Sequence, residues 1–291
     1  MTVYELLVQP FADFGFMRRA LVATLALALG SASIGTLLVL RRMSLMGDAM
    51  AHALLPGVAV GFLFAGFSLT AMSLGGFVAA MAVALAAGGV TRLTRQREDA
   101  SFAAFYLMAL AAGVLLVSVR GTSVDLMHLL FGSVLAVDDA ALLLMAGVAS
   151  VTLLVLALIA RPLVLECVDP GYLHSVGGGG PWVHAAFLVL AVANLVAGFQ
   201  ALGTLMAVGL MMLPATAARF WAAEVWSLAL AATLMALLSG VIGLLLSYHA
   251  QWPSGPAIVL VAGALYLLSL GFGRREGLFW RHRSRHAHRT A

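Results

Sequence analysis

The chain has 291 residues, of which 63% are hydrophobic and only 10% are charged. A soluble domain carries roughly 25% charged residues, so this composition excludes an ordinary soluble protein and indicates a polytopic membrane protein. All 16 basic residues are Arg. A chain without Lys cannot form a nucleotide-binding P-loop, so any ATP hydrolysis must belong to a partner. The formal charge of +4 is assigned to membrane topology rather than to nucleic-acid binding, since Arg residues stand at the ends of apolar segments.

Residues 1–16 mix three Phe with acidic and amide side chains and are expected to form an interfacial segment. Beyond them, nine segments satisfy the requirement of about 20 mainly apolar residues for a transmembrane helix. These segments are 18–40, 49–67, 70–91, 101–119, 138–160, 183–199, 201–218, 225–248 and 255–272. The segment 201–218 is short and contains Pro214, which is typical of a broken or partly re-entrant helix. We therefore expect a single all-α transmembrane domain over residues 1–291, with eight or nine transmembrane helices.

An acid and an imidazole, Asp48 and His52, stand at the start of the second candidate span. Their i, i+4 spacing places them on one face of a helix. Ionisable groups at membrane depth are costly and usually line a path for an ion or a proton, and a carboxylate with an imidazole suits Zn²⁺, Mn²⁺ or Fe²⁺. Two structural interpretations compete with this one: Asp48 could be only a helix N-cap, and His52 only a hydrogen-bonded buried histidine. Pro56 and Gly57 favour the functional interpretation, since a weakened helix beside polar groups is typical of a transport path.

The Arg residues predict an orientation for the spans. With the C-terminus in the cytoplasm, most of them fall on the cytoplasmic side, as the positive-inside rule requires. Nine spans then place the N-terminus outside, whereas eight spans place it inside. The basic, His-rich tail over 273–291 belongs to the cytoplasmic side. It could bind metal through its histidines or serve only as a solvated topogenic end.

The longest polar interior stretch, 161–182, is expected to be cytoplasmic. It contains Glu166, an Asp169-Pro170-Gly171 turn signal and four consecutive glycines from Gly177. It could dock a soluble partner as a coupling segment or be an ordinary connecting loop. Cys167 is the single cysteine, which excludes an intrachain disulfide and a multi-cysteine metal site.

Apart from the leading pair and the tail, the histidines are not assigned as metal ligands. His249 falls in an outer loop between the last two spans, where it could guide a metal into the mouth or be an exposed histidine with no role, and His128 falls near the outer side. His174 and His184 have no partner at a useful spacing. The acidic pair Glu98-Asp99 reads as a helix N-terminus, where acids favour the positive end of the helix dipole.

The stretch RRMSLMGDAMAHALLPGV over 41–58 resembles the signature of the membrane permeases of zinc/manganese-type metal-ion ABC importers. Four further stretches match that family in order: EDAS at 98–101, VDLMHLLFG at 124–132, LGTL at 202–205 leading into LPATAAR at 213–219, and LSY at 246–248 leading into PSG at 253–255. The resemblance covers nearly the whole chain.

This resemblance implies an ABC importer permease bundle in the cytoplasmic (inner) membrane, present as a homodimer. Its partners would be a cytoplasmic ATP-binding subunit and an extracytoplasmic metal-binding protein. Asp48 and His52 match the positions that meet the metal, and Asp169, Pro170 and Gly177 match the coupling helix that docks the ATPase. The family usually has an acid and an Ala after the Asp-Pro pair, and this chain lacks both.

Three functions follow as hypotheses. The leading one is a non-enzymatic permease subunit that moves a divalent transition metal, with no cofactor apart from the transported ion. Zinc is favoured because imidazole suits it and the tail adds His282, His286 and His288, while manganese and iron are also accommodated. The alternative is a proton-coupled secondary metal transporter in which Asp48 and His52 form the relay. An intramembrane enzyme ranks last, because no recognisable catalytic motif is present.

Overall fold

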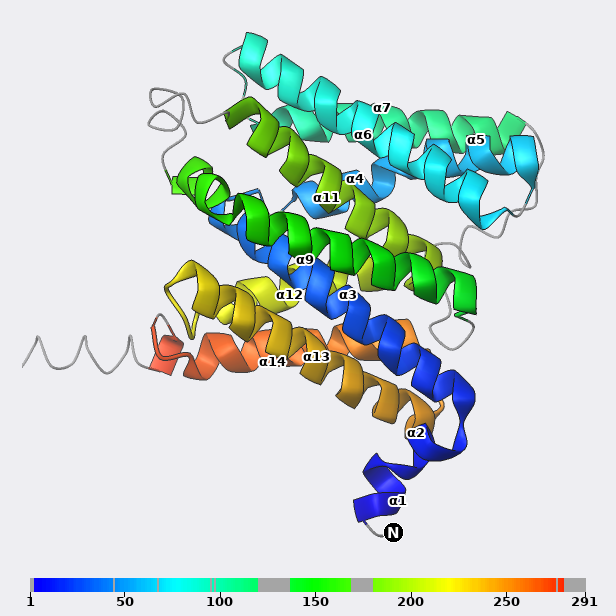
Figure 1. Cartoon of the computed structure of the whole chain (residues 1–291), viewed down its shortest axis with the longest axis vertical. Helices are drawn as coiled ribbons and strands as arrows, with labels where there is room; N and C mark the ends of the chain where they lie inside the picture. The colour runs from blue at the N-terminus through cyan, green and yellow to red at the C-terminus, as the bar shows by residue number, and fades with distance from the viewer. Residues whose placement is uncertain are drawn as a thin grey trace, which may run out of the picture.

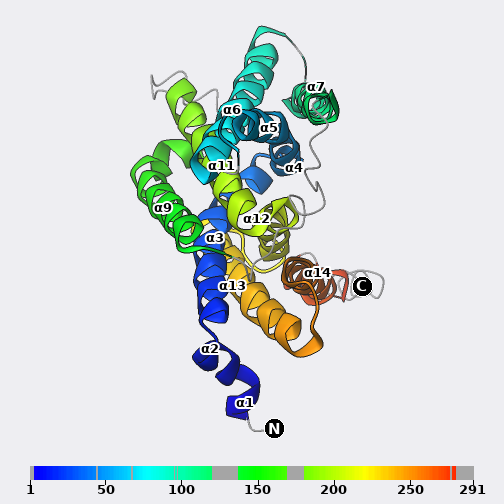
Figure 2. The same ribbon diagram turned by 90° about the vertical axis from the view of Figure 1, so that its right-hand side faces the viewer.

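The computed structural model describes residues 3–279 except 44, 67, 95, 97, 120–136, 169–179 and 276. Every element in these ranges is a helix. Figure 1 shows the helices stacked along the long axis of the molecule, with α1 and α2 projecting at one end. Figure 2 looks nearly along α7 and α14 and shows α3, α11 and α12 between the outer helices. The elements are α1 (Val3–Leu7), α2 (Gln9–Asp13), α3 (Gly15–Leu40), α4 (Met46–Ala53), α5 (Leu55–Ala65), α6 (Leu69–Leu93), α7 (Glu98–Val119), α9 (Asp139–Val168), α11 (Gly180–Leu202), α12 (Thr204–Ala218), α13 (Val225–Ala250) and α14 (Ser254–Phe272).

Eight helical stretches in the described ranges are long and apolar enough to cross a membrane, and α4 and α5 together form one of them. The remaining candidate, α12, has 15 residues, which is about 22 Å of helix and short of the roughly 30 Å hydrocarbon core. Gly203 separates it from α11 with φ 86, a left-handed backbone angle that favours glycine. Gly198 lies against Ala207, so α12 turns back along α11. The predicted eight- or nine-helix membrane fold is confirmed.

Burial separates the central helices from the peripheral ones. Over an 18-residue apolar stretch of α3 and of α11, 72% of the residues are buried, whereas over the corresponding stretches of α7 and α9 only 17% are. A polar contact links the central helix α11 to the peripheral helix α9. The Asn194 amide donates to the Thr152 hydroxyl at 2.6 Å and to the Leu190 carbonyl at 2.8 Å. Such interhelical hydrogen bonds satisfy polar groups that lipid cannot.

The helices α5 and α6 approach until their backbones touch. Gly57 of α5 faces Gly75 of α6, and a Cβ added to either residue would overlap the carbonyl of the other. Gly61 lies in the same way against the backbone of Ala71. Small residues at a helix crossing allow this approach in membranes, where packing rather than hydrophobicity drives helix association.

The prediction that residues 161–182 form one polar connecting stretch is wrong at both ends. Helix α9 continues through Pro162 to Val168, and α11 already begins at Gly180. Leu163 is 1% exposed, which anchors the last turns of α9 in the core, and Glu166 finds buried polar partners there. Polarity at this point reflects a buried contact between helices and not exposure to solvent.

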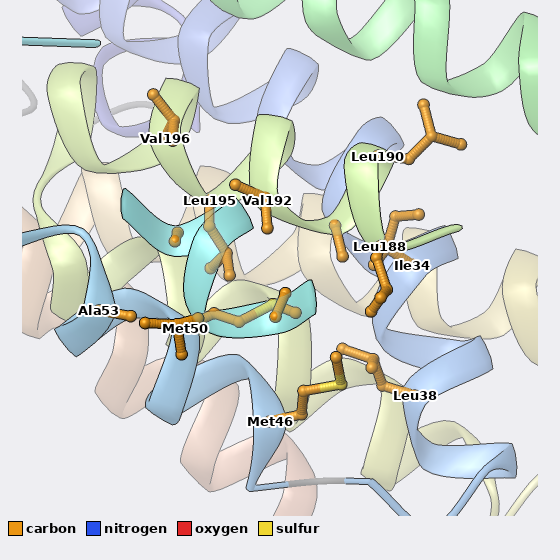
Figure 3. Close-up of a cluster of buried hydrophobic side chains, with 14 of the residues drawn as sticks. Ile34, Leu38, Met46, Met50, Ala53, Leu188, Leu190, Val192, Leu195 and Val196 are labelled. Atoms are coloured by element: carbon orange, nitrogen blue, oxygen red, sulfur yellow. The ribbon is translucent and has the colours of Figure 1, made fainter. Parts of the chain in front are cut away.

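A hydrophobic cluster joins the end of α3 to α4 and α11. Ile34 and Leu38 of α3, Met46 and Met50 of α4, and Leu188 and Leu195 of α11 belong to it, and Figure 3 shows these side chains together. Met50, Ile34 and Leu38 are fully buried. The helix that carries Asp48 is therefore held against the centre of the bundle by its apolar face.

Candidate metal site in a broken helix

The short helix α4 begins without a capping side chain. Its N-cap is Leu45, which forms no side-chain hydrogen bond, and Asp48 lies inside the first turn. The interpretation of Asp48 as an N-cap is therefore wrong. An acidic side chain in the first turn is favourably placed with respect to the helix dipole, so Asp48 is accommodated there without acting as a cap.

Asp48 and His52 face each other as their spacing predicts. His52 Nε2 lies 3.6 Å from Asp48 Oδ1, and the two side chains are 31% and 61% exposed. Two ligands that bind one ion at about 2.0–2.2 Å with tetrahedral angles lie roughly 3.4 Å apart. The pair therefore needs almost no rearrangement to share an ion. In the described ranges, no cluster of three or more His, Cys, Asp or Glu residues could hold a metal.

An aromatic ring from another helix orients the imidazole. Tyr106 of α7 stacks on His52 with 6.1 Å between ring centroids and 26° between planes. His52 Nδ1 is buried and forms no hydrogen bond with any described residue, so His52 is not a hydrogen-bonded core histidine of the usual kind. Metal-binding histidines usually have their second nitrogen hydrogen-bonded, and here stacking on Tyr106 is the contact that orients the ring.

The helical hydrogen-bond pattern is interrupted one turn after His52, where the sequence predicts a weakened helix, while Leu54 itself keeps helical backbone angles. Leu54 separates α4 from α5, and Pro56 stands in the first turn of α5. Since proline has no N–H, the His52 carbonyl cannot receive the usual bond from the residue four positions later. Gly113 of α7 lies against Pro56, so α7 covers the break while it also supplies Tyr106.

The other predicted features divide into three groups. Helix α7 begins at Glu98, as the acidic pair predicts. His249 is not in a loop: it lies in the last turn of α13, and its Nε2 is 3.1 Å from the Leu6 carbonyl oxygen, which ties the N-terminal segment to the bundle. The docking residues Asp169, Pro170 and Gly177, together with His128 and the tail histidines, lie outside the described residues.

A second polar cluster was missed by the sequence analysis. His184, to which no partner was assigned, contacts both Arg41 and Glu166. The residues come from three different helical segments, and Arg41 and His184 lie 143 positions apart in the sequence. Helical spacing cannot bring such residues together, so only the polarity of Glu166 within an apolar chain could have drawn attention to it.

The fold and the paired donors define a multi-pass membrane permease, and comparison with known proteins agrees. The chain belongs to the ABC 3 transport family, whose model matches residues 13–273. The manganese import system permease protein ScaB of Streptococcus parasanguinis is 32% identical over 261 residues, covering 88% of this chain and 90% of that protein. The chelated iron transport system membrane protein YfeD of Yersinia pestis is 31% identical over 268 residues, covering 92% of this chain and 89% of that protein.

A solved structure gives the same assignment. PsaBC from Streptococcus pneumoniae, in complex with Fab, superimposes with a TM-score of 0.82 at 27% identity, covering 94% of this chain and 98% of that chain. The chain is therefore a permease subunit of an ABC transporter and not an enzyme, as the sequence predicts.

Proposed function

We propose that this permease imports a divalent transition metal ion and that Asp48 and His52 are its metal-binding residues. The observation that carries the proposal is the 3.6 Å separation of Asp48 Oδ1 and His52 Nε2 on one face of a broken helix. A carboxylate oxygen and an imidazole nitrogen are ligands that first-row divalent metals accept. Two donors are fewer than the closed four-ligand set of a structural zinc site, which suits an ion that must leave again.

The energy source and the other partners follow from the family. A cytoplasmic ATP-binding subunit would dock at Asp169, Pro170 and Gly177, and an extracytoplasmic metal-binding protein would deliver the ion. A second copy of the chain would complete a homodimer in the cytoplasmic membrane. The cytoplasmic position of the C-terminus is supported by the Arg275 amide, which donates to the Phe220 carbonyl at 3.1 Å. This contact brings the Arg-bearing ends of α12 and α14 together, as the positive-inside rule expects of one membrane side.

Manganese is the first cargo to test. The relatives described above are named for manganese and for chelated iron, whereas the preference for zinc rests on imidazole chemistry and on tail histidines outside the described residues. An Asp–His pair accommodates all three ions. Uptake of radioactive ⁵⁴Mn²⁺ in competition with unlabelled Zn²⁺ and Fe²⁺ would rank them directly.

The role of the pair is tested by uptake of ⁵⁴Mn²⁺ into proteoliposomes that contain the permease, its ATPase and its binding protein. Asp48→Ala and His52→Ala should each abolish uptake while the complex still assembles. Asp139→Ala and His249→Ala are matched controls, since both residues are exposed and distant from the pair in sequence, and they should leave uptake unchanged. Wild-type uptake by both pair variants would refute the site. Uptake by the permease alone, without ATP, would instead support the proton-coupled alternative.

A further inference from the structure

A buried polar cluster links three helices near the end of α3. We call it the Arg41 cluster; its members are Arg41, Glu166, Cys167, His184 and Phe187. Arg41 Nη2 lies 3.1 Å from Glu166 Oε2, and Arg41 Nε donates to Cys167 Sγ at 3.3 Å. Arg41 Nη1 lies 2.8 Å from His184 Nδ1, and the same nitrogen lies 3.3 Å from Glu166 Oε1. The guanidinium also lies 4.6 Å from the centre of the Phe187 ring, a cation–π distance.

The cluster is nearly sealed from solvent. The side chains of Arg41 and Glu166 are 8% and 11% exposed, and that of His184 is 13% exposed. Burying two opposite charges is costly unless they are paired, and removing one partner strands the other. One planar guanidinium contacts three neighbours at once, a geometry that the single ammonium of lysine cannot reproduce.

The backbone at the end of α3 holds Arg41 in the position from which it contacts α9 and α11. Arg41 is the C-cap of α3, and Arg42 follows with φ 59 in the left-handed region. The Arg42 amide donates to the Val39 carbonyl at 3.1 Å, and the Met43 amide donates to the Leu38 carbonyl at 2.9 Å. These two bonds form a Schellman motif, which closes the helix and sets the direction in which the chain leaves toward α4.

Arg41 stands between two parts of the permease that have separate tasks. On one side, Glu166 and Cys167 end α9 just before the proposed ATPase-docking residues, and His184 lies in the first turns of α11 just after them. On the other side, the chain reaches Asp48 seven residues after Arg41. Met43, Met46 and Met50 along this path belong to the same buried hydrophobic cluster, and Figure 3 shows Met46 and Met50 in it. A displacement of α9 and α11 at the Arg41 cluster is therefore passed to α4 through packed groups.

We propose that Arg41 is a positioning residue that couples movement of α9 and α11 to the metal-binding helix α4, by holding Glu166 and His184 from both helices on one guanidinium. This inference rests on the proposed function, because it takes the ATPase to act on the segment between α9 and α11. Arg41 does not touch the metal. Its expected effect is on the number of ions moved per ATP hydrolysed.

The test measures ATP hydrolysis and ⁵⁴Mn²⁺ uptake together in proteoliposomes of the complete complex. Arg41→Lys keeps the charge but loses the simultaneous contacts. Arg41→Gln/Glu166→Gln removes both charges, so that none is stranded. Both variants should hydrolyse ATP near the wild-type rate, while Mn²⁺ moved per ATP falls by about tenfold, within the range of measured coupling energies. Arg42→Gln is the matched control, since Arg42 is next to Arg41 in the chain and its side chain is exposed. The number of Mn²⁺ ions moved per ATP by this variant should equal that of the wild type.

The outcomes separate the inference from the function on which it rests. If the two cluster variants keep the wild-type ratio, or fail to assemble, the cluster only holds the fold and the inference is overturned. If the wild-type complex itself shows no ATP-dependent uptake of Mn²⁺, Fe²⁺ or Zn²⁺, the proposed function fails. A lowered ratio beside an unchanged Arg42→Gln control supports the coupling role.

Discussion

Replacing Arg41 alone should destabilise the protein more than replacing it together with Glu166. The Glu166 side chain is 11% exposed, so in Arg41→Met its carboxylate stays buried and loses its guanidinium partner, while the contact with His184 at 3.3 Å remains. Breaking a buried pair in this way costs about 3–5 kcal/mol. Replacing both members with apolar side chains removes the stranded charge, and such joint replacements are often close to neutral. The second substitution should therefore restore about 2 kcal/mol or more of the loss.

Equilibrium unfolding by SDS in mixed micelles, followed by the fluorescence of the five tryptophans, measures this difference. The variants are Arg41→Met, Glu166→Met and the double substitution. Arg42→Met is the control, because it removes an exposed Arg from the same turn and should change stability by less than about 0.5 kcal/mol. If the loss of stability in the double variant equals the sum of the losses in the two single variants, the reasoning that the buried carboxylate depends on Arg41 is refuted.

Three further predictions concern the backbone and the proposed metal site. Arg42→Gly should stabilise the protein by up to about 1 kcal/mol in the same unfolding assay, because glycine adopts the left-handed angle without strain; an unchanged or lower stability would contradict the assigned helix end. Gly57→Ala should destabilise the protein by about 1–3 kcal/mol, because the added methyl group overlaps the facing carbonyl. Gly147→Ala is the control: it has open space around it and should be neutral or stabilising. Equal effects of the two substitutions on stability would argue against backbone contact between α5 and α6. Tyr106→Phe should preserve ⁵⁴Mn²⁺ uptake and Tyr106→Ala should lower it several-fold, because only alanine removes the ring that orients His52; equal uptake by the two would exclude a role for stacking.

The membrane helices could be predicted because lipid imposes a length and a composition. The predicted span 225–248 differs by only a few residues from α13, Val225–Ala250, and 255–272 differs by one residue from α14, Ser254–Phe272. The facing pair Asp48 and His52 also followed from local spacing, since residues four apart share a helix face. What could be predicted was local in each case.

The errors involve contacts between distant parts of the chain. Pro162 and Glu166 look like loop residues when only their neighbours are considered. Helix α9 nevertheless continues through them, because Leu163 is buried and Glu166 pairs with Arg41. Tyr106 likewise reaches His52 only through the packing of α7 against α4, which no spacing along the chain reveals.

The contact between α5 and α6 limits which movements the permease can make. Where two backbones touch through Gly57 and Gly75, neither helix can slide along the other, because any shift in register would drive a side chain into main-chain atoms. We therefore expect α5 and α6 to move together as one unit. Backbone hydrogen bonds run on both sides of Leu54, from the Leu54 amide to the Met50 carbonyl and from the Val58 amide to the Leu54 carbonyl, so a movement of α5 with α6 would be transmitted along the chain to α4, which carries His52.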